Sequence, residues 1–283
     1  MNKDSLFVFL QYIIPQHALS RLVGWFASTE IEFIKSTFIT KFAKKYQVNM
    51  DEALVEDLSS FASFNEFFTR ELKDGARPIA QGEGLLVSPA DGAVSQLGKI
   101  ELGKVFQAKG RDFSVTTLLG GDTERASKFL NGEFATIYLS PKDYHRVHMP
   151  CAGKLLETVY VPGDLFSVNP TTAQGVDGLF ARNERLVCMF ETEYGPMAMV
   201  LVGAMIVAGI ETVWSGQVCP LSKKAQVQDY TQSEVRLEKG QEMGRFKLGS
   251  TVVLCFPEDS VKFLEEIKAE SPLMMGQALA AKQ

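Results

Sequence analysis

The pattern of apolar and polar residues divides the chain into two parts with different periodicities. In residues 1–72 apolar side chains recur at helical spacing, and this predicts helices over 5–26, 29–47, 51–60 and 64–72. From about residue 84 to residue 260 the pattern changes to short alternating or β-branched runs, separated by Gly, Pro and Asp. One helical piece over 111–131 interrupts these runs, and 258–283 is expected to form a polar, partly helical tail. The sequence therefore predicts an α+β protein with a helical region over 1–72 and a β-rich body over 73–283, built from packed antiparallel sheets or a flattened barrel.

The stretch from Thr29 to Tyr46 combines an apolar stripe with several lysines. Five apolar residues recur at steps of three or four, as on one face of a helix: Ile31, Ile34, Phe38, Phe42 and Tyr46. Thr29 with Glu32 has the spacing of a capping box, and Ser63 with Glu66 has the same spacing before 64–72. Lysines at 35, 41, 44 and 45 flank the stripe. Two interpretations remain open, a helix that lies in an anionic membrane interface and a helix that packs on the protein's own core.

Composition excludes several classes of protein. The chain has 283 residues, of which 46% are hydrophobic and 22% charged, so it is not a disordered, collagen-like or coiled-coil chain. Its formal net charge of −5 provides no general basic field for nucleic acid. The four cysteines form no CxxC pair, which favours free thiols in a reducing compartment. No segment has the pattern of a cleaved signal peptide or a comfortable membrane span, so the protein is expected on the cytoplasmic side. Phenylalanine is concentrated near the N-terminus, with half of the 20 in the first 70 residues, which favours contact with a membrane.

Histidine is rare, so each of the three can be considered separately. His17 lies in the Phe-rich N-terminal region and is expected to be structural. His145 and His148 lie in SPKDYHRVHMP, directly after a predicted strand. Their HxxH spacing allows a metal pair, but no Asp, Glu or Cys accompanies it at ligand spacing, so no metal site is predicted. Imidazole titrates near neutral pH, which favours a general acid or base, and histidines held structurally in a loop remain the alternative.

Two further segments suggest a role in a reaction only in combination with these histidines. Asp91, in SPADGAV, fits either an ordinary Asp-Gly turn or a carboxylate that orients an imidazole. Ser250 follows Gly249 and opens a strongly β-forming run, without the GxSxG pattern of an α/β-hydrolase. By itself a Gly-Ser turn into a strand is structural. The chain has no P-loop, GxGxxG, HExxH or EF-hand pattern, so any chemistry has to come from its own side chains.

Several motifs together resemble a known family. They are SFNEFFTRELKDGARPI, SPADG, SPKDYHRVHMP, YVPGDLFSVN, LFARNERLV, ETVWSG and MGRFKLGSTV. In this order, from about residue 60 to residue 260, they resemble the bacterial phosphatidylserine decarboxylases of the membrane-associated type. The resemblance implies that a proenzyme cleaves itself between Gly249 and Ser250, into a large chain 1–249 and a small chain 250–283.

The resemblance also implies roles for individual residues. The Ser250 hydroxyl attacks the Gly249 carbonyl, with His148 as the base and Asp91 holding that imidazole in the correct tautomer. β-Elimination and hydrolysis then leave a pyruvoyl group at residue 250, so neither pyridoxal phosphate nor a metal is expected. That group forms a Schiff base with phosphatidylserine, and loss of CO₂ gives phosphatidylethanolamine. His145 is expected to return the proton or to position the substrate carboxylate.

The resemblance further implies a peripheral protein on the cytoplasmic side of the cell membrane. Its expected partners are phosphatidylserine, an anionic membrane surface and a second processed pair of chains in a homodimer, with no nucleic acid. Three alternatives remain open from the residues alone. They are a Ser/His/Asp hydrolase or self-cleaving peptidase without pyruvoyl formation, a non-enzymatic β-sandwich binding module, and a pyruvoyl decarboxylase for a different amino acid.

Overall fold

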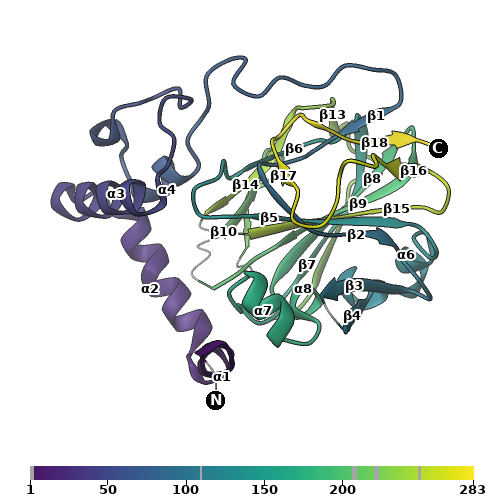
Figure 1. Cartoon of the computed structure of the whole chain (residues 1–283), viewed down its shortest axis with the longest axis horizontal. Coiled ribbons are helices and arrows are strands. Elements are labelled where there is room, and N and C mark those ends of the chain that lie inside the picture. The colour runs from purple at the N-terminus through teal and green to yellow at the C-terminus, as the bar shows by residue number, and fades with distance from the viewer. Residues whose placement is uncertain (1–2, 109, 206–208, 220–222, 248–249) are drawn as a thin grey trace.

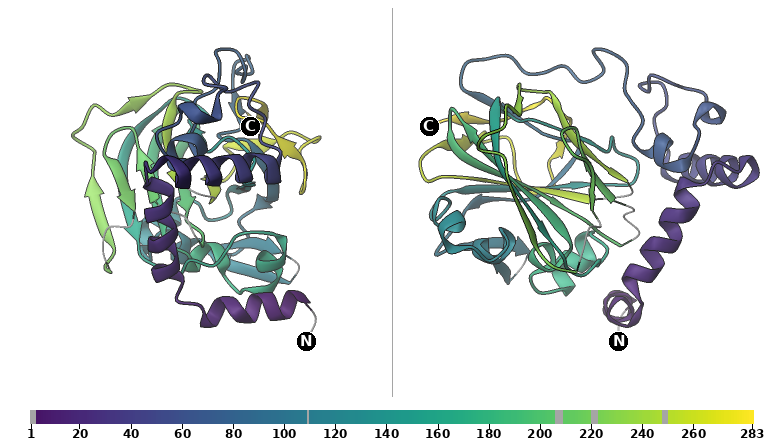
Figure 2. Two further views of the ribbon diagram at one scale, coloured as in Figure 1. Left: turned by 90° about the vertical axis from the view of Figure 1, so that its left-hand side faces the viewer. Right: turned by 180° about the vertical axis from the view of Figure 1, so that it is seen from behind.

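A helical arm and a β-rich body make up the computed structural model of the chain (Figure 1). The structure describes residues 3–108, 110–205, 209–219, 223–247 and 250–283, with the exception of the Ser250 side chain. The helices of the arm are α1 (Lys3–Ile13), α2 (Gln16–Ser28), α3 (Glu32–Tyr46), the 3₁₀ turn η1 (Leu58–Ser60) and α4 (Phe64–Phe68). A long connection then runs over one end of the body to the first strand, as the view from behind also shows (Figure 2).

The arm differs from the sequence prediction in three places. The expected helix 5–26 is broken by Pro15, and the two helices α1 and α2 meet at 88°. Most of 51–60 is not helical, since η1 covers only its end. The predicted capping box at Thr29 is wrong, because α3 starts at Glu32 with no side-chain cap. The cap at Ser63 is confirmed, since its side chain accepts a hydrogen bond from the Glu66 amide.

Antiparallel sheets form the body, as predicted, in packed layers rather than as a closed barrel. The largest sheet runs in the order β12 (Gln226–Asp229), β7 (Gly153–Val161), β8 (Arg185–Thr192), β9 (Gly195–Val202), β15 (Ser250–Phe256), β5 (Glu133–Leu139), β2 (Gly92–Lys99) and β17 (Pro272–Leu273), with β13 (Arg236–Leu237) also paired to β7. A four-stranded sheet has the order β11 (Gly216–Cys219), β10 (Gly209–Thr212), β14 (Glu242–Lys247) and β6 (Arg146–His148). Two smaller sheets contain β1 (Leu85–Val87), β18 (Ala278–Lys282) and β16 (Val261–Phe263), and β3 (Lys104–Ala108) with β4 (Arg111–Ser114).

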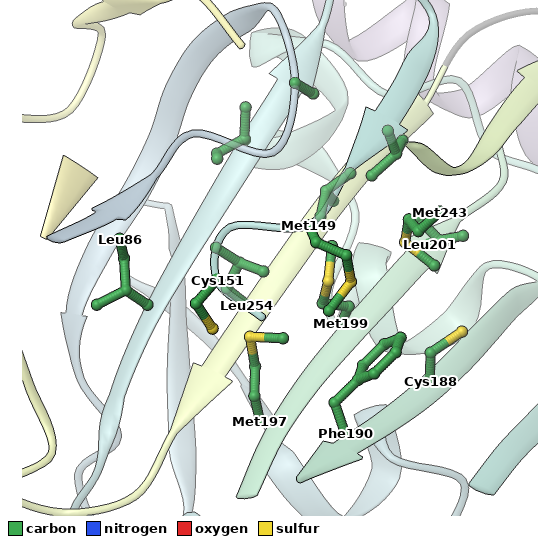
Figure 3. Close-up of a cluster of buried hydrophobic side chains, with 14 of the residues drawn as sticks. Leu86, Met149, Cys151, Cys188, Phe190, Met197, Met199, Leu201, Met243 and Leu254 are labelled. Carbon is green, nitrogen blue, oxygen red and sulfur yellow. The ribbon is translucent and has the colours of Figure 1, made fainter. Parts of the chain in front are cut away.

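Both faces of the large sheet are buried. Along β15, Val252 and Leu254 belong to one core cluster while Val253 and Cys255 belong to another, as expected from the period of two in a strand. The first cluster is rich in sulfur and aromatic side chains, and Figure 3 shows its centre. The second cluster lies under four short helices: α5 (Val115–Leu118), α6 (Thr123–Ser127), α7 (Pro170–Gly175) and α8 (Leu179–Arg182). A strand apolar on both faces, such as β15, is therefore placed rigidly at the middle of the body.

Two predictions about the body are wrong in detail. The tail 258–283 is not helical but supplies three strands: β17 pairs with β2, and β18 pairs with β1 on one side and with β16 on the other. The segment 111–131 starts as strand β4 and contains two short helices rather than one piece. In both segments tertiary pairing overrides a weak local preference, because short polar stretches carry little periodicity of their own.

The apolar stripe of α3 packs against the protein itself. Phe38 stacks on Phe64 with ring centroids 4.2 Å apart, and Phe42 contacts Phe64 at 4.9 Å. The core interpretation of this stripe is therefore confirmed for its central residues. Large apolar side chains are exposed elsewhere on the arm: Leu6, Phe7, Phe9, Leu10, Tyr12, Ile13, Leu22, Trp25, Phe26, Ile31 and Phe33. Within the described residues no single helix is long and apolar enough to cross a membrane, although α1 and α2 pass that test as a bent pair.

Candidate active site

The predicted cleavage position falls where the chain passes from one sheet to another. Lys247 ends β14 in the four-stranded sheet, and Ser250 begins β15 in the large sheet. The backbone of Ser250 pairs with Leu139 of β5, while Thr251 lies between Tyr138 and Val202. Gly249 and the side chain of Ser250 lie outside the described part of the chain, so only the backbone of Ser250 is placed.

Asp91 lies at the same end of the large sheet as Ser250. Tyr138 of β5 pairs on one side with Thr251 and on the other with Ala93 of β2. Asp91 precedes β2 directly and is therefore two strands from the start of β15, about 10 Å between strand axes. Gly92 makes this packing possible, because a Cβ at its position would lie 2.2 Å from the carbonyl oxygen of Tyr138.

A buried ion pair holds the Asp91 carboxylate. The Nε of Arg77 donates to both carboxylate oxygens at 2.9 and 3.0 Å, and Nη2 donates at 2.6 Å. Oδ1 also accepts from the Met275 amide at 2.8 Å, and Glu52 accepts from the same guanidinium at 2.9 Å. Burial alone would lower the pKa of Arg77, but its hydrogen bonds to Asp91 and Glu52 and their charges raise it. The carboxylate is therefore fixed and ionic in this arrangement.

His148 is the second predicted site residue, and it lies beside the Asp91 turn. Its backbone amide donates to the Pro89 carbonyl at 2.8 Å. Its Nδ1 lies 2.8 Å from the Gly240 carbonyl oxygen, which makes Nδ1 the protonated nitrogen. The Nε2 then accepts from the hydroxyl of Tyr144 at 3.1 Å. Among the described residues Asp91 makes no hydrogen bond to His148, but burial lowers the pKa of His148 and the charge of Asp91 acts in the opposite direction.

His145 lies closer to the start of β15 along the strands. Its carbonyl accepts from the Phe246 amide at 3.0 Å, whereas His148 is opposite Glu242, four residues further back along β14. His148 follows His145 by three residues, and β14 has a bulge between Glu242 and Gly244, so at about 3.4 Å per residue His148 lies ~10 Å further from the end of β14. His145 also closes the loop that leaves β5 after Leu139, the residue paired with Ser250.

The ring of His145 is fully buried with one free nitrogen. Nδ1 donates to the Asp143 carbonyl at 2.8 Å, so Nε2 carries the lone pair. Within the described residues Nε2 has no hydrogen-bond partner. Burial lowers the pKa of His145 to about 3, so the ring is neutral near pH 7, and the ring of Phe68 covers it with centroids 3.9 Å apart. A neutral imidazole with an unshared lone pair can accept a proton or a hydrogen bond from a reacting group.

The site contains residues to which the sequence analysis gave no role. Arg70 is 5% exposed, and its Nε has no partner within the described residues. Burial lowers the pKa of Arg70, while the charge of Asp91 acts against this. Arg77 and Tyr144 were not assigned either. All three lie inside the motifs quoted above, but only their contacts show what they do.

A cavity of about 280 Å³ lies on the helical side of the large sheet. Tyr138, paired with Thr251, forms part of one wall, and Val168, Asn169 and Pro170 form another. Gln107 also lines it, with a buried side-chain oxygen that has no described partner. The cavity is therefore mostly apolar with a few polar groups, as is usual for small-ligand sites.

Two further features of the sequence, His17 and the potential metal ligands, can be placed in the structure. His17 lines a recess between α2 and the body and carries no described role in a reaction. In the described part of the chain no group of three or more His, Cys, Asp or Glu side chains could hold a metal ion.

Comparison with known proteins finds a matching family model and similar relatives. Residues 64–281 match the family model described as phosphatidylserine decarboxylase, and residues 6–47 match a model described as PSD. The chain is 59% identical over 281 residues to the phosphatidylserine decarboxylase proenzyme of Pseudomonas fluorescens (strain Pf0-1), covering 98% of both chains. It is 60% identical to the proenzymes of the same name from Saccharophagus degradans, covering 99% of both chains, and Alcanivorax borkumensis, covering 99% of this chain and 97% of the relative.

Proposed function

The chain belongs to the phosphatidylserine decarboxylase family, and we propose that it is a proenzyme that cleaves itself before Ser250 and then decarboxylates phosphatidylserine. One observation supports this beyond the family match. His145, His148 and Asp91 lie at the end of the sheets where the strand of Ser250 begins, with both imidazoles kept neutral by burial and the carboxylate held by Arg77. These are the groups needed to activate a hydroxyl and to move a proton.

Self-cleavage converts the Gly249–Ser250 amide into an ester. The Ser250 oxygen attacks the Gly249 carbonyl, its proton passes to a base, and the amide nitrogen leaves as the free amine of Ser250. β-Elimination then releases the Gly249 carboxylate and leaves a dehydroalanine at residue 250. Water adds to the tautomer of this residue and ammonia leaves, which gives the pyruvoyl group.

The structure fits a reactive group at residue 250. β15 is paired on one side with β5 and on the other with β9, so its first residue stays in place after the peptide bond is broken. Two further strands of the segment 250–283 pair with strands of the segment 1–249: β17 pairs with β2, and β18 pairs with β1. Within the segment 250–283, β16 pairs with β18. We therefore expect the small chain 250–283 to remain bound to the large chain 1–249 without a covalent link.

A pyruvoyl group supplies a ketone that condenses with an amine and accepts the electron pair left when CO₂ departs. The chain's own residues bind and orient the substrate around it. The unshared Nε2 of His145 supports its proposed role, either returning a proton to the substrate carbon or orienting the carboxylate. The cavity beside Tyr138 supports a binding place for the lipid head group and glycerol backbone.

The assignment of His148 as the base of self-cleavage, with Asp91 behind it, stays a prediction. Proximity supports it: burial lowers the pKa of His148, and the charge of Asp91 is near enough to act weakly against that lowering. For a direct hydrogen bond, Asp91 has to exchange one contact with Arg77 and His148 has to leave Gly240. The position of His145 supports the same role for this residue. Of the two variants His145→Ala and His148→Ala, the one that stays uncleaved identifies the base.

We propose a peripheral location at the cytoplasmic face of the membrane. The many exposed large apolar side chains of α1 and α2 support it, because exposed apolar residues concentrated on helices are typical of interfacial contact. The four buried free cysteines are compatible with a reducing compartment. The double variant Phe9→Ser with Trp25→Ser should reduce sedimentation with phosphatidylserine vesicles at least fivefold, and the exposed Val227→Ser, on β12, should leave it unchanged. Equal sedimentation of both would refute membrane contact by the arm.

A direct assay tests the reaction. Purified protein incubated with phosphatidylserine vesicles should release CO₂ and form phosphatidylethanolamine, and Ser250→Ala should do neither. If the chain stays intact and reacts with serine-directed phosphonates at Ser250, it is a hydrolase instead. If it is cleaved but decarboxylates only free amino acids, the lipid substrate is wrong. A homodimer of processed pairs remains a prediction, which light scattering tests.

A further inference from the structure

Three successive backbone amides in the loop after β7 are held by side chains rather than by backbone. The Leu165 amide donates to Oε1 of Gln16 at 2.6 Å. The next amide, that of Phe166, donates to Oδ1 of Asn183 at 3.0 Å. The Ser167 amide donates to Oε1 of Gln11 at 2.8 Å, and its hydroxyl donates to the same oxygen at 3.0 Å.

Two of these three acceptors come from the N-terminal arm. Gln11 lies on α1 and Gln16 on α2, and the Nε2 of Gln16 also donates to the Gln11 carbonyl at 2.8 Å. Gln11 is 2% exposed, although most of its neighbours on α1 are exposed and apolar. A polar side chain buried under an apolar helix is costly unless it is hydrogen-bonded, so these bonds determine how the helix sits on the body.

The remaining contacts of α1 are made with the same loop and with the neighbouring helix α7. The ring of Tyr12 packs edge-on against Phe166 at 4.9 Å. The guanidinium of Arg182 lies over both rings, at 5.5 and 4.8 Å, while it pairs with Asp164 at 2.8 Å. Val8 fills the space above Gly175 of α7, where a Cβ would lie 2.6 Å from its side chain. The inner side of α1 is therefore fitted to the loop 164–169 and to α7.

This loop continues directly into the cavity wall. Ser167 is followed by Val168 and Asn169, which line the cavity beside Tyr138, and Asn169 donates to the Ser167 hydroxyl at 3.3 Å. If α1 and α2 move away from the body, the amides of Leu165 and Ser167 lose their acceptors, and a buried amide without a partner is unfavourable. The arm and the wall are thus linked by specific hydrogen bonds.

We propose that Gln11 and Gln16 are positioning residues, which transmit the docking of the lipid-facing helices α1 and α2 to the wall of the substrate cavity. The inference rests on the proposed decarboxylation at residue 250. It adds that the arm does more than attach the protein to a membrane, because its seating shapes the wall formed by Val168 and Asn169.

The test separates docking from membrane binding. Gln11→Met keeps the length of the side chain and removes the acceptor, while Gln11→Glu keeps an acceptor oxygen for Ser167. Gln228→Met, on the exposed strand β12, is the matched control. Each protein is compared with the unsubstituted chain for cleavage on a denaturing gel, for sedimentation with phosphatidylserine vesicles, and for kcat and KM of decarboxylation in those vesicles.

We expect Gln11→Met to be cleaved and to sediment as the unsubstituted chain does, but to lose at least fivefold in kcat. Gln11→Glu should stay within twofold, and Gln228→Met should not differ from the unsubstituted chain. Unchanged kcat and KM in Gln11→Met would overturn the inference while leaving the decarboxylase proposal intact. If the unsubstituted chain itself is inactive, the proposed function fails instead.

A second measurement covers the case in which Gln11→Met does not fold. Hydrogen exchange of the Leu165 and Ser167 amides is followed in Gln16→Met, which removes the acceptor for Leu165 and the donor to the Gln11 carbonyl but leaves the acceptor for Ser167. Exchange should become at least tenfold faster at Leu165 and along the loop into Val168. Unchanged exchange at Val168 would show that the wall does not depend on the arm, and would overturn the inference.

Discussion

Replacing Asp91 by asparagine removes one charge from a buried ion pair while keeping the size of the side chain. The side chains of Arg77 and Asp91 are 7% and 9% exposed, and three N–O contacts join them. Removal of one partner from such a pair costs about 3–5 kcal/mol, because the other charge stays buried without compensation. Glu52 keeps one contact with the guanidinium, so we expect the lower end, about 3 kcal/mol.

The assay is urea unfolding of Asp91→Asn in a Ser250→Ala background, so that every variant is compared as an uncleaved chain. Glu52→Gln is the control at the other end of the network. Its carboxylate is 33% exposed, so its loss should cost about 1 kcal/mol or less. An Asp91→Asn variant as stable as its parent would refute the structural role of the ion pair.

Substitutions of Arg77 and Asp91 separate the effect on stability from the effect on self-cleavage. Arg77→Ala leaves Asp91 buried without its cation and should destabilise the chain as strongly as Asp91→Asn. With Ser250 present, only Asp91→Asn should stop self-cleavage if the carboxylate acts on His148. Equal loss of cleavage in both variants would assign Asp91 to folding alone.

Two further predictions concern His145. His145→Ala should still be cleaved at least in part but should lose decarboxylation of phosphatidylserine vesicles by at least a hundredfold, and full turnover would make the ring a scaffold. Burial lowers the pKa of His145 to about 3 from its ordinary value of 6.5, so the unfolded chain binds more protons between these two pH values. The unfolding free energy of the Ser250→Ala chain should therefore fall as the pH is lowered from 7 to 5, with up to about 1.4 kcal/mol per pH unit due to this ring. His145→Gln should flatten that slope in urea unfolding, and an unchanged slope would contradict the burial of the ring.

The architecture was predictable from the sequence where local signals agree with tertiary packing. From Val252 to Phe256 β15 is apolar without interruption because both of its faces are buried, and its β-branched residues predicted a strand. The helices of the arm were predictable from their spacing, but the break at Pro15 was missed. The strands of the tail were not predictable, since β17 is only two residues long and exists because β2 offers it an edge.

The site was predictable as a set of residues but not as a geometry. Motifs at Asp91, His145, His148 and Ser250 identified residues that lie at one end of the sheets, far apart in sequence. No sequence motif indicates which side chains and carbonyl groups contact one another. The partners of the two imidazoles, Gly240 and Tyr144 for His148 and Asp143 for His145, follow only from the fold.

The apolar stripe in the segment 29–47 left two interpretations open, and the structure decides between them for its central residues. Phe38 and Phe42 of that stripe pack on α4. Periodicity detects an apolar face but does not tell whether protein or lipid covers it. Exposed apolar residues gather instead on α1 and α2, where exposed polar residues such as Arg21 lie among them.

The intact mass of the freshly purified, denatured protein tests the central claim most directly. Self-processing predicts two species from the 31.3 kDa chain, of about 27.5 kDa for residues 1–249 and about 4 kDa for residues 250–283. The small species should be about 17 Da lighter than a peptide that starts with serine, through the loss of ammonia. A single species of 31.3 kDa that persists on incubation, or a small chain that retains its serine, would contradict the proposed pyruvoyl enzyme.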